Sequence, residues 1–179
     1  MANLIQEQQK TAFNTLKGDF GWKSVMQVPK VEKVTISVGV GKVVKDKQKI
    51  ALIADRLAKI TGQKPAKRGA KKAIATYKTR VGDHIGYQVT LRGKRAQDFI
   101  NRLVHIALPR TKDFKGIPSN SVDEMGNYTL GIREHIVFPE TAEEELKDVF
   151  GMAITVGTSA KNKKEASAYL THLGFPFKK

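Results

Sequence analysis

The chain has 179 residues, enough for a domain with a sizeable core, and its 40% apolar content is ordinary for a folded protein. Its 32 Lys and Arg residues exceed its 17 Asp and Glu residues, and the net charge of +15 favours a polyanionic partner, either nucleic acid or an anionic membrane surface. The lack of cysteine excludes disulfides and thiolate metal sites, and the sequence has neither a signal-peptide pattern nor an apolar run of membrane-spanning length, so we expect a cytoplasmic protein.

The positive charge is concentrated in the first hundred residues. Residues 1–100 hold 21 Lys and Arg against 7 acids, a net charge of +14, whereas residues 101–179 hold 11 against 10. We therefore expect the first part to face a polyanion and the second part to meet a different partner.

The first predicted elements are a helix, a strand and a second helix. Apolar side chains recur at helical spacing over residues 5–16, and Gly18 is expected to end that helix. Val and Ile alternate with Lys, Thr, Ser and Gly over residues 33–40, which predicts a strand. The second helix is expected from its N-cap, Asp46, to Thr61, with the glycine that follows as its stop.

The middle of the chain predicts three strands and one helix. Period-two alternation indicates strands at residues 87–92, 128–133 and 152–157. The helix is expected from about Lys94 to Leu108, because the next residue is a proline.

The last predicted helix begins at Asn162 and closes at Gly174. Asn162 and Glu165 have the spacing of a capping box, with Asn in place of Ser or Thr. A proline two residues after Gly174 supports the end of the helix there.

Each predicted strand has one apolar face and one face of short polar or basic residues. Helices packed on the apolar faces of a mostly antiparallel sheet would give an α+β fold whose second sheet face stays open. We expect a single domain over residues 1–179, with a flexible basic loop at about 66–83 and a long contact loop at about 109–127.

The most distinctive local feature is the cationic run at residues 59–80. It holds eight Lys and Arg residues, no acid, and one aromatic residue, Tyr77. Closely spaced cations suit a phosphate backbone, and the ring could stack on an exposed base. The alternative is a solvated surface loop, but the length of the run and the charge of the first hundred residues favour RNA contact.

The polar face of the predicted sheet is a second candidate RNA-binding surface. Short hydroxyl side chains let an RNA minor groove approach, and Lys33 and Arg92 would lie on the same face for phosphates. An ordinary half-exposed sheet alternates in the same way, and the alternation alone does not decide between the two. The short polar residues of this face are Thr35, Ser37, Gly39, Gln88, Thr90 and Thr155.

An acidic stretch at residues 140–148 has two interpretations. Such a run is often the wet face of a short helix. Alternatively, it repels RNA from that side and attracts a basic protein.

The sequence contains no P-loop, no dinucleotide-binding glycine pattern, no nucleophile elbow and no HExxH motif. The four histidines lie at least 21 residues apart without metal-ligand spacing, so we predict no enzyme, no metal and no cofactor. An RNA-processing nuclease with a histidine pair near the basic run is the alternative from the enzyme class. A peripheral membrane protein is a third hypothesis, disfavoured because the cations lie in a run with few large apolar residues.

Six blocks in order resemble one family of ribosomal proteins: SVMQVPKVEKVTISVGVGK (24–42), ITGQKP (60–65), YQVTLRG (87–93), LPRTKDFKGI (108–117), GNYTLGIREHIVFPE (126–140) and GFPFKK (174–179). Together they are similar to the fifth family of bacterial large-subunit ribosomal proteins, which binds 5S rRNA. The similarity covers essentially the whole chain. The chain departs from the family at Ser37-Val38, where members commonly carry Asn-Met, and at Arg68, where a small hydroxyl residue is common.

The resemblance implies an antiparallel sheet whose open face docks on 5S rRNA in the central protuberance, beside 23S rRNA and other proteins of that region. It also implies a loop that reaches P-site tRNA, and a bridge to the thirteenth small-subunit ribosomal protein. The expected 5S rRNA-binding residues are Lys33, Thr35, Ser37, Gly39, Gln63, Lys64, Thr90 and Arg92. The expected tRNA-contacting residues are Ala75, Thr76, Tyr77, Lys78, Thr79, Arg80, Val81 and Gly82. The expected bridge residues are Arg110, Thr111, Lys112, Asp113, Phe114, Lys115, Glu143 and Glu144.

Overall fold

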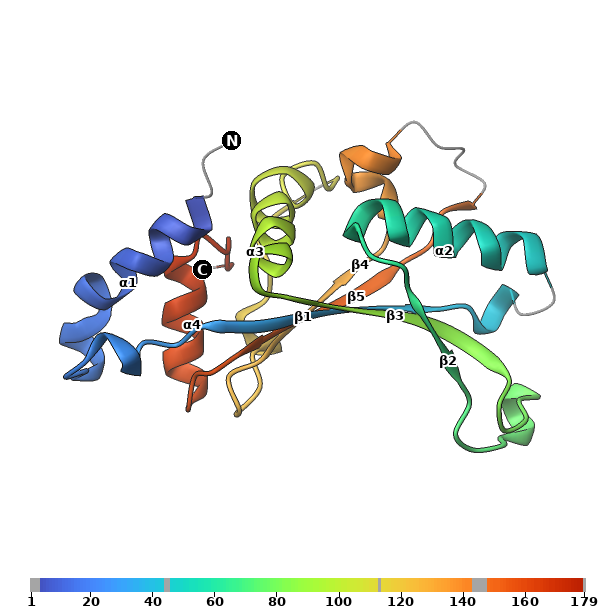
Figure 1. Cartoon of the computed structure of the whole chain (residues 1–179), viewed down its shortest axis with the longest axis horizontal. Coiled ribbons are helices and arrows are strands. Elements are labelled where there is room, and N and C mark those ends of the chain that lie inside the picture. The colour runs from blue at the N-terminus through green and yellow to red at the C-terminus, as the bar shows by residue number, and fades with distance from the viewer. Residues whose placement is uncertain (1–3, 44–45, 113, 143–147, 179) are drawn as a thin grey trace. The chain divides into compact units, whose positions relative to one another are not determined.

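The structure is a computed structural model that describes residues 4–43, 46–112, 114–142 and 148–178. Its strands form one mostly antiparallel sheet in the order β2-β3-β1-β5-β4, which together with the helices confirms the predicted α+β fold (Figure 1). The elements in chain order are α1 (Leu4–Phe20), β1 (Val31–Gly39), α2 (Lys47–Thr61), β2 (Ala66–Gly69), β3 (His84–Arg92), α3 (Gly93–Arg102), β4 (Tyr128–Ile132), β5 (Met152–Thr158) and α4 (Lys163–His172).

The described residues form two compact units. The first lies within Met1–Val34, Leu91–Leu130 and Thr155–Lys179, and the second within Thr35–Thr90 and Gly131–Ile154. A single domain for the whole chain stays a prediction.

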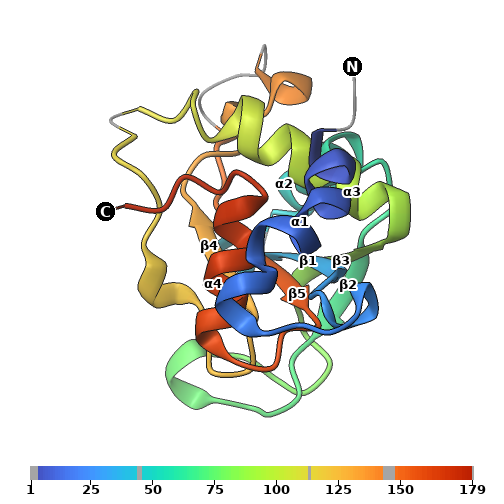
Figure 2. The same cartoon turned by 90° about the vertical axis from the view of Figure 1, so that its left-hand side faces the viewer.

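In the first unit, α1 packs against α3 and α4 (Figure 1 and Figure 2). Each helix buries an apolar stripe, represented by Ile5 in α1, Phe99 in α3 and Leu170 in α4. The helix α3 continues into one π-helical turn, Leu103–Ala107, and the helical region ends before Pro109 as predicted.

The predicted end of α1 at Gly18 is wrong. The helix continues to Phe20, and the residue that ends it is Gly21, whose φ of +64° is left-handed and whose N–H donates to the Lys17 carbonyl at 2.9 Å. A helix stop of this kind requires a left-handed residue, and Gly18 is not one.

The capping box predicted for α4 is also wrong. Asn162 is the N-cap residue, but its side chain makes no cap hydrogen bond. The Glu165 carboxylate instead accepts from the Trp22 indole Nε1–H at 3.1 Å and from the Lys161 N–H at 2.8 Å. Burial of the indole requires an acceptor for its N–H, and Glu165 supplies that acceptor from a distant part of the chain.

In the second unit, α2 lies over the apolar side of β1 and β3 (Figure 1). Both predicted ends of this helix are confirmed: Asp46 accepts from two N–H groups of the first turn at 3.1 Å, and Gly62 follows with a φ of +67°. The buried stripe of α2 includes Ile53, Leu57 and Ile60.

The predicted loop at 66–83 begins with a strand that the sequence pattern does not predict. Residues Ala66–Gly69 form β2, which pairs antiparallel with β3 and sets Ala66 opposite Gln88. All four residues of β2 are exposed, so the alternation that predicts a strand is missing. The loop prediction is therefore wrong for these residues, and backbone pairing to β3 is the reason.

Candidate nucleic-acid interface

The two faces of strands β1 and β3 differ in polarity as predicted. In β1, Val34, Ile36 and Val38 are buried, whereas the residues between them are half-buried or exposed. In β3, Tyr87, Val89 and Leu91 are buried. The residues that alternate with them are Lys33, Thr35, Ser37, Gly39, Gln88, Thr90 and Arg92, and none of these seven is buried.

In the second unit, the side chain of Gln63 lies beside β3. Its Nε2 donates to the Thr90 carbonyl at 3.5 Å, and the Thr61 hydroxyl accepts from the Gln63 backbone N–H at 3.3 Å. The Gln63 side chain is therefore brought next to Thr90, while the neighbouring Lys64 is exposed. These contacts bring together residues that are 27 positions apart in sequence.

Glycines leave one stretch of the polar face without projecting side chains. A Cβ added at Gly86 would lie 2.8 Å from the carbonyl oxygen of Val38, closer than real side chains allow. Gly39 is exposed, and the Arg68 Nε–H donates to the Gln88 Oε1 at 2.6 Å nearby in the β2–β3 pair. The result is a shallow surface on which backbone can be approached closely.

In the first unit, Lys33 and Arg92 are exposed on the same sides of β1 and β3. The aliphatic stem of Lys33 lies over Gly157, where an added Cβ would be 3.1 Å from the Lys33 Cγ. The hydroxyl of Thr129, which is absent from the predicted set, lies 3.2 Å from that of Thr155. Thr129 could have been selected from the sequence, because it occupies a polar position of the alternating segment 128–133.

The charge on these polar positions has one sign. Cations are present at Lys33 and Arg92, and no Asp or Glu occupies the alternate positions of β1, β3, β4 or β5 that carry the polar residues. A phosphate near Lys33 or Arg92 is attracted by that cation, and none of these positions carries a carboxylate that would repel it.

The tRNA-contacting residues predicted at 75–82 come together at the tip of the β2–β3 hairpin. Ile74 and Thr79 exchange two backbone hydrogen bonds of 3.2 and 3.3 Å, and the turn between them contains Lys78 with a left-handed φ of +51°. Thr79 is half-buried, whereas Tyr77 is 74% exposed and the other six residues of the set are exposed as well. The backbone of the tip is thus hydrogen-bonded, and its aromatic and cationic side chains face solvent.

The predicted bridge residues lie partly outside the described residues. Asp113, Glu143 and Glu144 are among those not described. Of the others, Arg110, Lys112 and Lys115 are exposed, and Thr111 and Phe114 are half-buried.

The segment that carries these bridge residues is tied to the C-terminal region. The Ile117 N–H donates to the Pro176 carbonyl, and the Lys178 N–H donates to the Ile117 carbonyl, each at 2.8 Å. Gly116 lies next to this pairing with a φ of +93°, and an added Cβ there would meet the Lys178 nitrogen at 3.1 Å. These contacts fix one end of the cationic segment.

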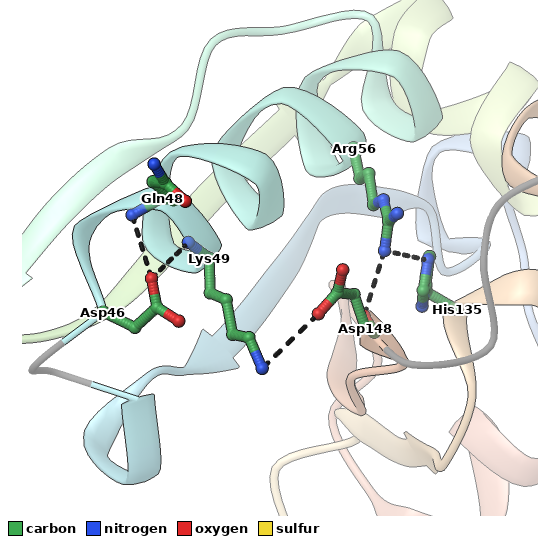
Figure 3. A network of polar contacts seen from close by, with 6 residues as sticks. All are labelled: Asp46, Gln48, Lys49, Arg56, His135 and Asp148. Atoms are coloured by element: carbon green, nitrogen blue, oxygen red, sulfur yellow. Dashed lines mark hydrogen bonds and ion pairs between the residues drawn. The ribbon is translucent and has the colours of Figure 1, made fainter.

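Sequence reasoning missed a buried polar network in the second unit (Figure 3). Arg56 is only 5% exposed, and its Nη1 donates to the Asp148 carbonyl at 3.0 Å and lies 3.5 Å from the Nε2 of His135. The ring of His135 is fully buried and stacks on Phe150 with a centroid distance of 4.1 Å. Burial, and then the charge of Arg56, lower the pKa of His135 to about 4. Arg56 shares the apolar stripe of its helix with Ile53, which was the available clue.

The histidines do not favour a nuclease. His135 is buried and uncharged near neutral pH, and the His172 Nε2 lies 2.8 Å from the Gln8 carbonyl. The His84 ring packs edge-on against Tyr87, while His105 is exposed. Within the described ranges, no three His, Cys, Asp or Glu side chains are grouped as metal ligands would be.

None of the helices in the described part of the chain combines the length and the apolar character needed to cross a bilayer.

Comparisons with known proteins agree with the resemblance found in the sequence. Residues 84–177 match the family described as the C-terminus of the ribosomal L5 proteins, and residues 24–80 match the family described as ribosomal protein L5. The chain is 51% identical to the large ribosomal subunit protein uL5 of Ureaplasma urealyticum serovar 10, over 100% of this chain and 97% of that protein. It is 47% identical to the protein of the same name from Flavobacterium johnsoniae, with 98% and 96% covered, and 44% identical to that of Colwellia psychrerythraea, with 100% and 99% covered.

The basic α+β fold and these matches define a structural protein of the ribosome and not an enzyme. The chain belongs to the uL5 family of the large ribosomal subunit. Membership of this ribosomal family also supports the predicted cytoplasmic location.

Proposed function

We propose that the chain binds 5S rRNA through the polar side of β1 and β3 and helps to attach it to 23S rRNA in the central protuberance. The observation that carries this proposal is the accessible alternation of short polar residues with Lys33 and Arg92 on those strands. Hydroxyls such as those of Ser37 and Thr90 can pair with ribose 2′-OH groups and base edges in a shallow minor groove. The two cations contribute sequence-independent attraction to phosphates.

The tip of the β2–β3 hairpin is proposed to contact P-site tRNA. Tyr77, Lys78 and Arg80 supply one aromatic and two cationic side chains there, all exposed. Because backbone bonds hold the tip, these side chains are free for an RNA partner. A ring can stack on a base or sugar, and cations can follow the phosphates.

The exposed cations Arg110, Lys112 and Lys115 are proposed to take part in a bridge to the thirteenth small-subunit ribosomal protein. Their segment is held against the C-terminal region by the Ile117 hydrogen bonds, which limits its motion. Other proteins of the central protuberance are further proposed partners of the chain.

A double comparison of variants tests the division of labour between sheet and hairpin. The pair Thr90→Val and Arg92→Gln removes a hydroxyl and a charge from the polar side, and we expect 5S rRNA affinity to fall about tenfold to a hundredfold. The pair Lys78→Glu and Arg80→Glu should leave 5S rRNA affinity intact and weaken binding of tRNA. Filter binding or fluorescence anisotropy with each RNA measures both affinities.

The matched control is Thr15→Val with Arg95→Gln, which makes the same chemical changes at exposed helical positions. It should leave both affinities within about twofold of the parent value. Unchanged 5S rRNA affinity in the sheet variant would remove the sheet from the proposal. A joint fall of both affinities in the hairpin variant would contradict the separation of the two sites.

A further inference from the structure

The second unit contains an apolar groove. Three of its lining residues, Gly39, Tyr77 and Thr79, also belong to the proposed RNA-contacting sets, and its other lining residues do not. Its volume is about 1120 Å³, and its walls come from α2, the segment after β1, the hairpin tip and residues 148–151. The apolar side chains that line it include Leu52, Ile53, Ile74, Ile85 and Phe150. Ile74 is 46% exposed, so part of this lining is accessible to a partner.

Polar contacts hold one wall of the groove in place (Figure 3). The Lys49 Nζ lies 3.6 Å from the Asp148 Oδ1, and the buried Arg56 donates to the Asp148 carbonyl at 3.0 Å. Two residues of α2 therefore fix the start of the 148–151 wall. A groove with a fixed wall needs less ordering when it binds a partner.

Two exposed lysines, Lys71 and Lys72, are among the residues that line the groove. The one lining carboxylate, that of Asp148, is already paired with Lys49. Among the described residues, no carboxylate forms an ion pair with Lys71 or Lys72. The groove thus offers an apolar floor together with two cations.

The chemistry of the lining favours a protein segment over a nucleobase as the occupant. The edge of a base carries several hydrogen-bond donors and acceptors, and burying them without partners costs free energy. The apolar walls of this groove supply few such partners. A large aliphatic side chain or a phenylalanine ring has no such requirement. Carboxylates beside that apolar side chain would complement the charges of the two lysines.

We propose that this groove binds a short acidic segment of another protein, with one or two large apolar side chains in the groove and carboxylates against Lys71 and Lys72. The proposal rests on the groove alone and does not require the proposed contacts with 5S rRNA or tRNA.

The test uses the full-length chain and a fluorescein-labelled peptide with a Leu and a Phe flanked by glutamates. Two related peptides separate the contributions: one has both anchors replaced by Ser, and the other has each Glu replaced by Lys. We expect fluorescence anisotropy to show saturable binding of the first peptide, and each related peptide to bind at least about tenfold more weakly.

The variant Gly41→Leu probes the groove without changing any charge. Gly41 lines the groove, its φ is not left-handed, and a Cβ added there has no atom within 4 Å. The larger side chain should therefore compete with the peptide anchor and reduce affinity by at least about tenfold. The matched control is Gly18→Leu, at an exposed glycine of α1 whose Cβ is equally unobstructed, and it should bind like the parent chain.

The double variant Lys71→Glu and Lys72→Glu should also bind the first peptide more weakly than the parent chain does. The affinity that remains should depend less on salt concentration. Equal affinity for all three peptides, or unchanged affinity in Gly41→Leu, would overturn the proposal. A short oligouridine that binds the parent chain and is lost in Gly41→Leu, with no peptide binding, would show that the groove takes RNA. The affinity of Gly41→Leu for 5S rRNA is expected to match the parent value, so failure of this proposal and failure of the RNA proposal are distinguishable.

Discussion

The buried pair of Arg56 and His135 links the stability of the second unit to pH. His135 has no exposed surface, and burial together with the nearby guanidinium lowers its pKa from 6.5 to about 4. In the unfolded chain the ring takes up a proton near pH 6.5, whereas in the folded chain it stays neutral until about pH 4. The unfolded state therefore binds more protons between these two values, and the free energy of unfolding falls as the pH is lowered through that window.

Replacing His135 should make the stability less dependent on pH. In the parent chain this residue alone accounts for a loss of roughly 3 kcal/mol between about pH 6.5 and pH 4. In His135→Gln, which keeps an acceptor for the Phe150 N–H, that part of the slope should vanish even if the variant is less stable at neutral pH. Urea unfolding at a series of pH values measures the slope, and equal slopes for the two proteins would contradict the assignment.

Gly86 illustrates a second constraint at the scale of one residue. Its backbone lies so close to β1 that a Cβ would be 2.8 Å from the Val38 carbonyl oxygen. We expect Gly86→Ala to destabilise the fold by about 1–3 kcal/mol because a strand must shift to admit the methyl group.

The matched control for Gly86→Ala is Gly131→Ala. Gly131 is an exposed strand glycine whose added Cβ has no atom within 4 Å. Its replacement should leave the free energy of unfolding unchanged or raise it slightly. Equal effects of the two substitutions in urea unfolding would contradict the close approach at Gly86.

At the scale of elements, the two helix starts with acidic or amide caps differ in a testable way. Asp46 accepts two N–H groups of α2, so Asp46→Ala should cost about 1 kcal/mol, and Asp46→Asn less than half of that. The side chain of Asn162 makes no cap hydrogen bond at α4, so Asn162→Ala should change the stability by less than about 0.5 kcal/mol. Urea unfolding of the three variants measures these differences, and an equal cost at both caps would show that the α4 start is wrongly described.

The elements that could be predicted from the sequence are those encoded by local periodicity. The alternation in β1 and β3 and the stripe of α2 follow from side chains near one another in the chain, and the structure agrees with each. Strand β2 escaped prediction because its pairing with β3 is made by backbone groups and leaves no side-chain pattern. The partner of Glu165 escaped for a related reason: Trp22 lies 143 residues away.

In the candidate site, too, the residues in local patterns could be predicted and those brought together by long-range packing could not. The polar side of the strands is a local pattern, so Ser37, Thr90 and Arg92 could be selected from the sequence. The buried network of Arg56 and the groove beside it arise from long-range packing of α2 against residues 148–151. A single sequence contains no direct record of such contacts, although a cation within an apolar stripe marks one participant.

At the scale of the whole molecule, charge and fold point to the same partner. The net charge of +15 gives long-range attraction to any RNA, and most of it belongs to the first hundred residues. That attraction cannot by itself select one RNA, because phosphates are common to all. We propose that selection depends on the polar side of β1 and β3, where shape and hydroxyl contacts act at short range.

A salt titration of affinity for 5S rRNA and for a size-matched unrelated RNA tests this account most directly. Both affinities should fall as salt is raised, because the release of counterions from the RNA contributes less free energy at higher ionic strength. The chain should bind 5S rRNA more tightly throughout, and the ratio of the two affinities should grow with salt as the unselective attraction is screened. Equal affinities for the two RNAs at every salt concentration would contradict selection by the polar side of the sheet.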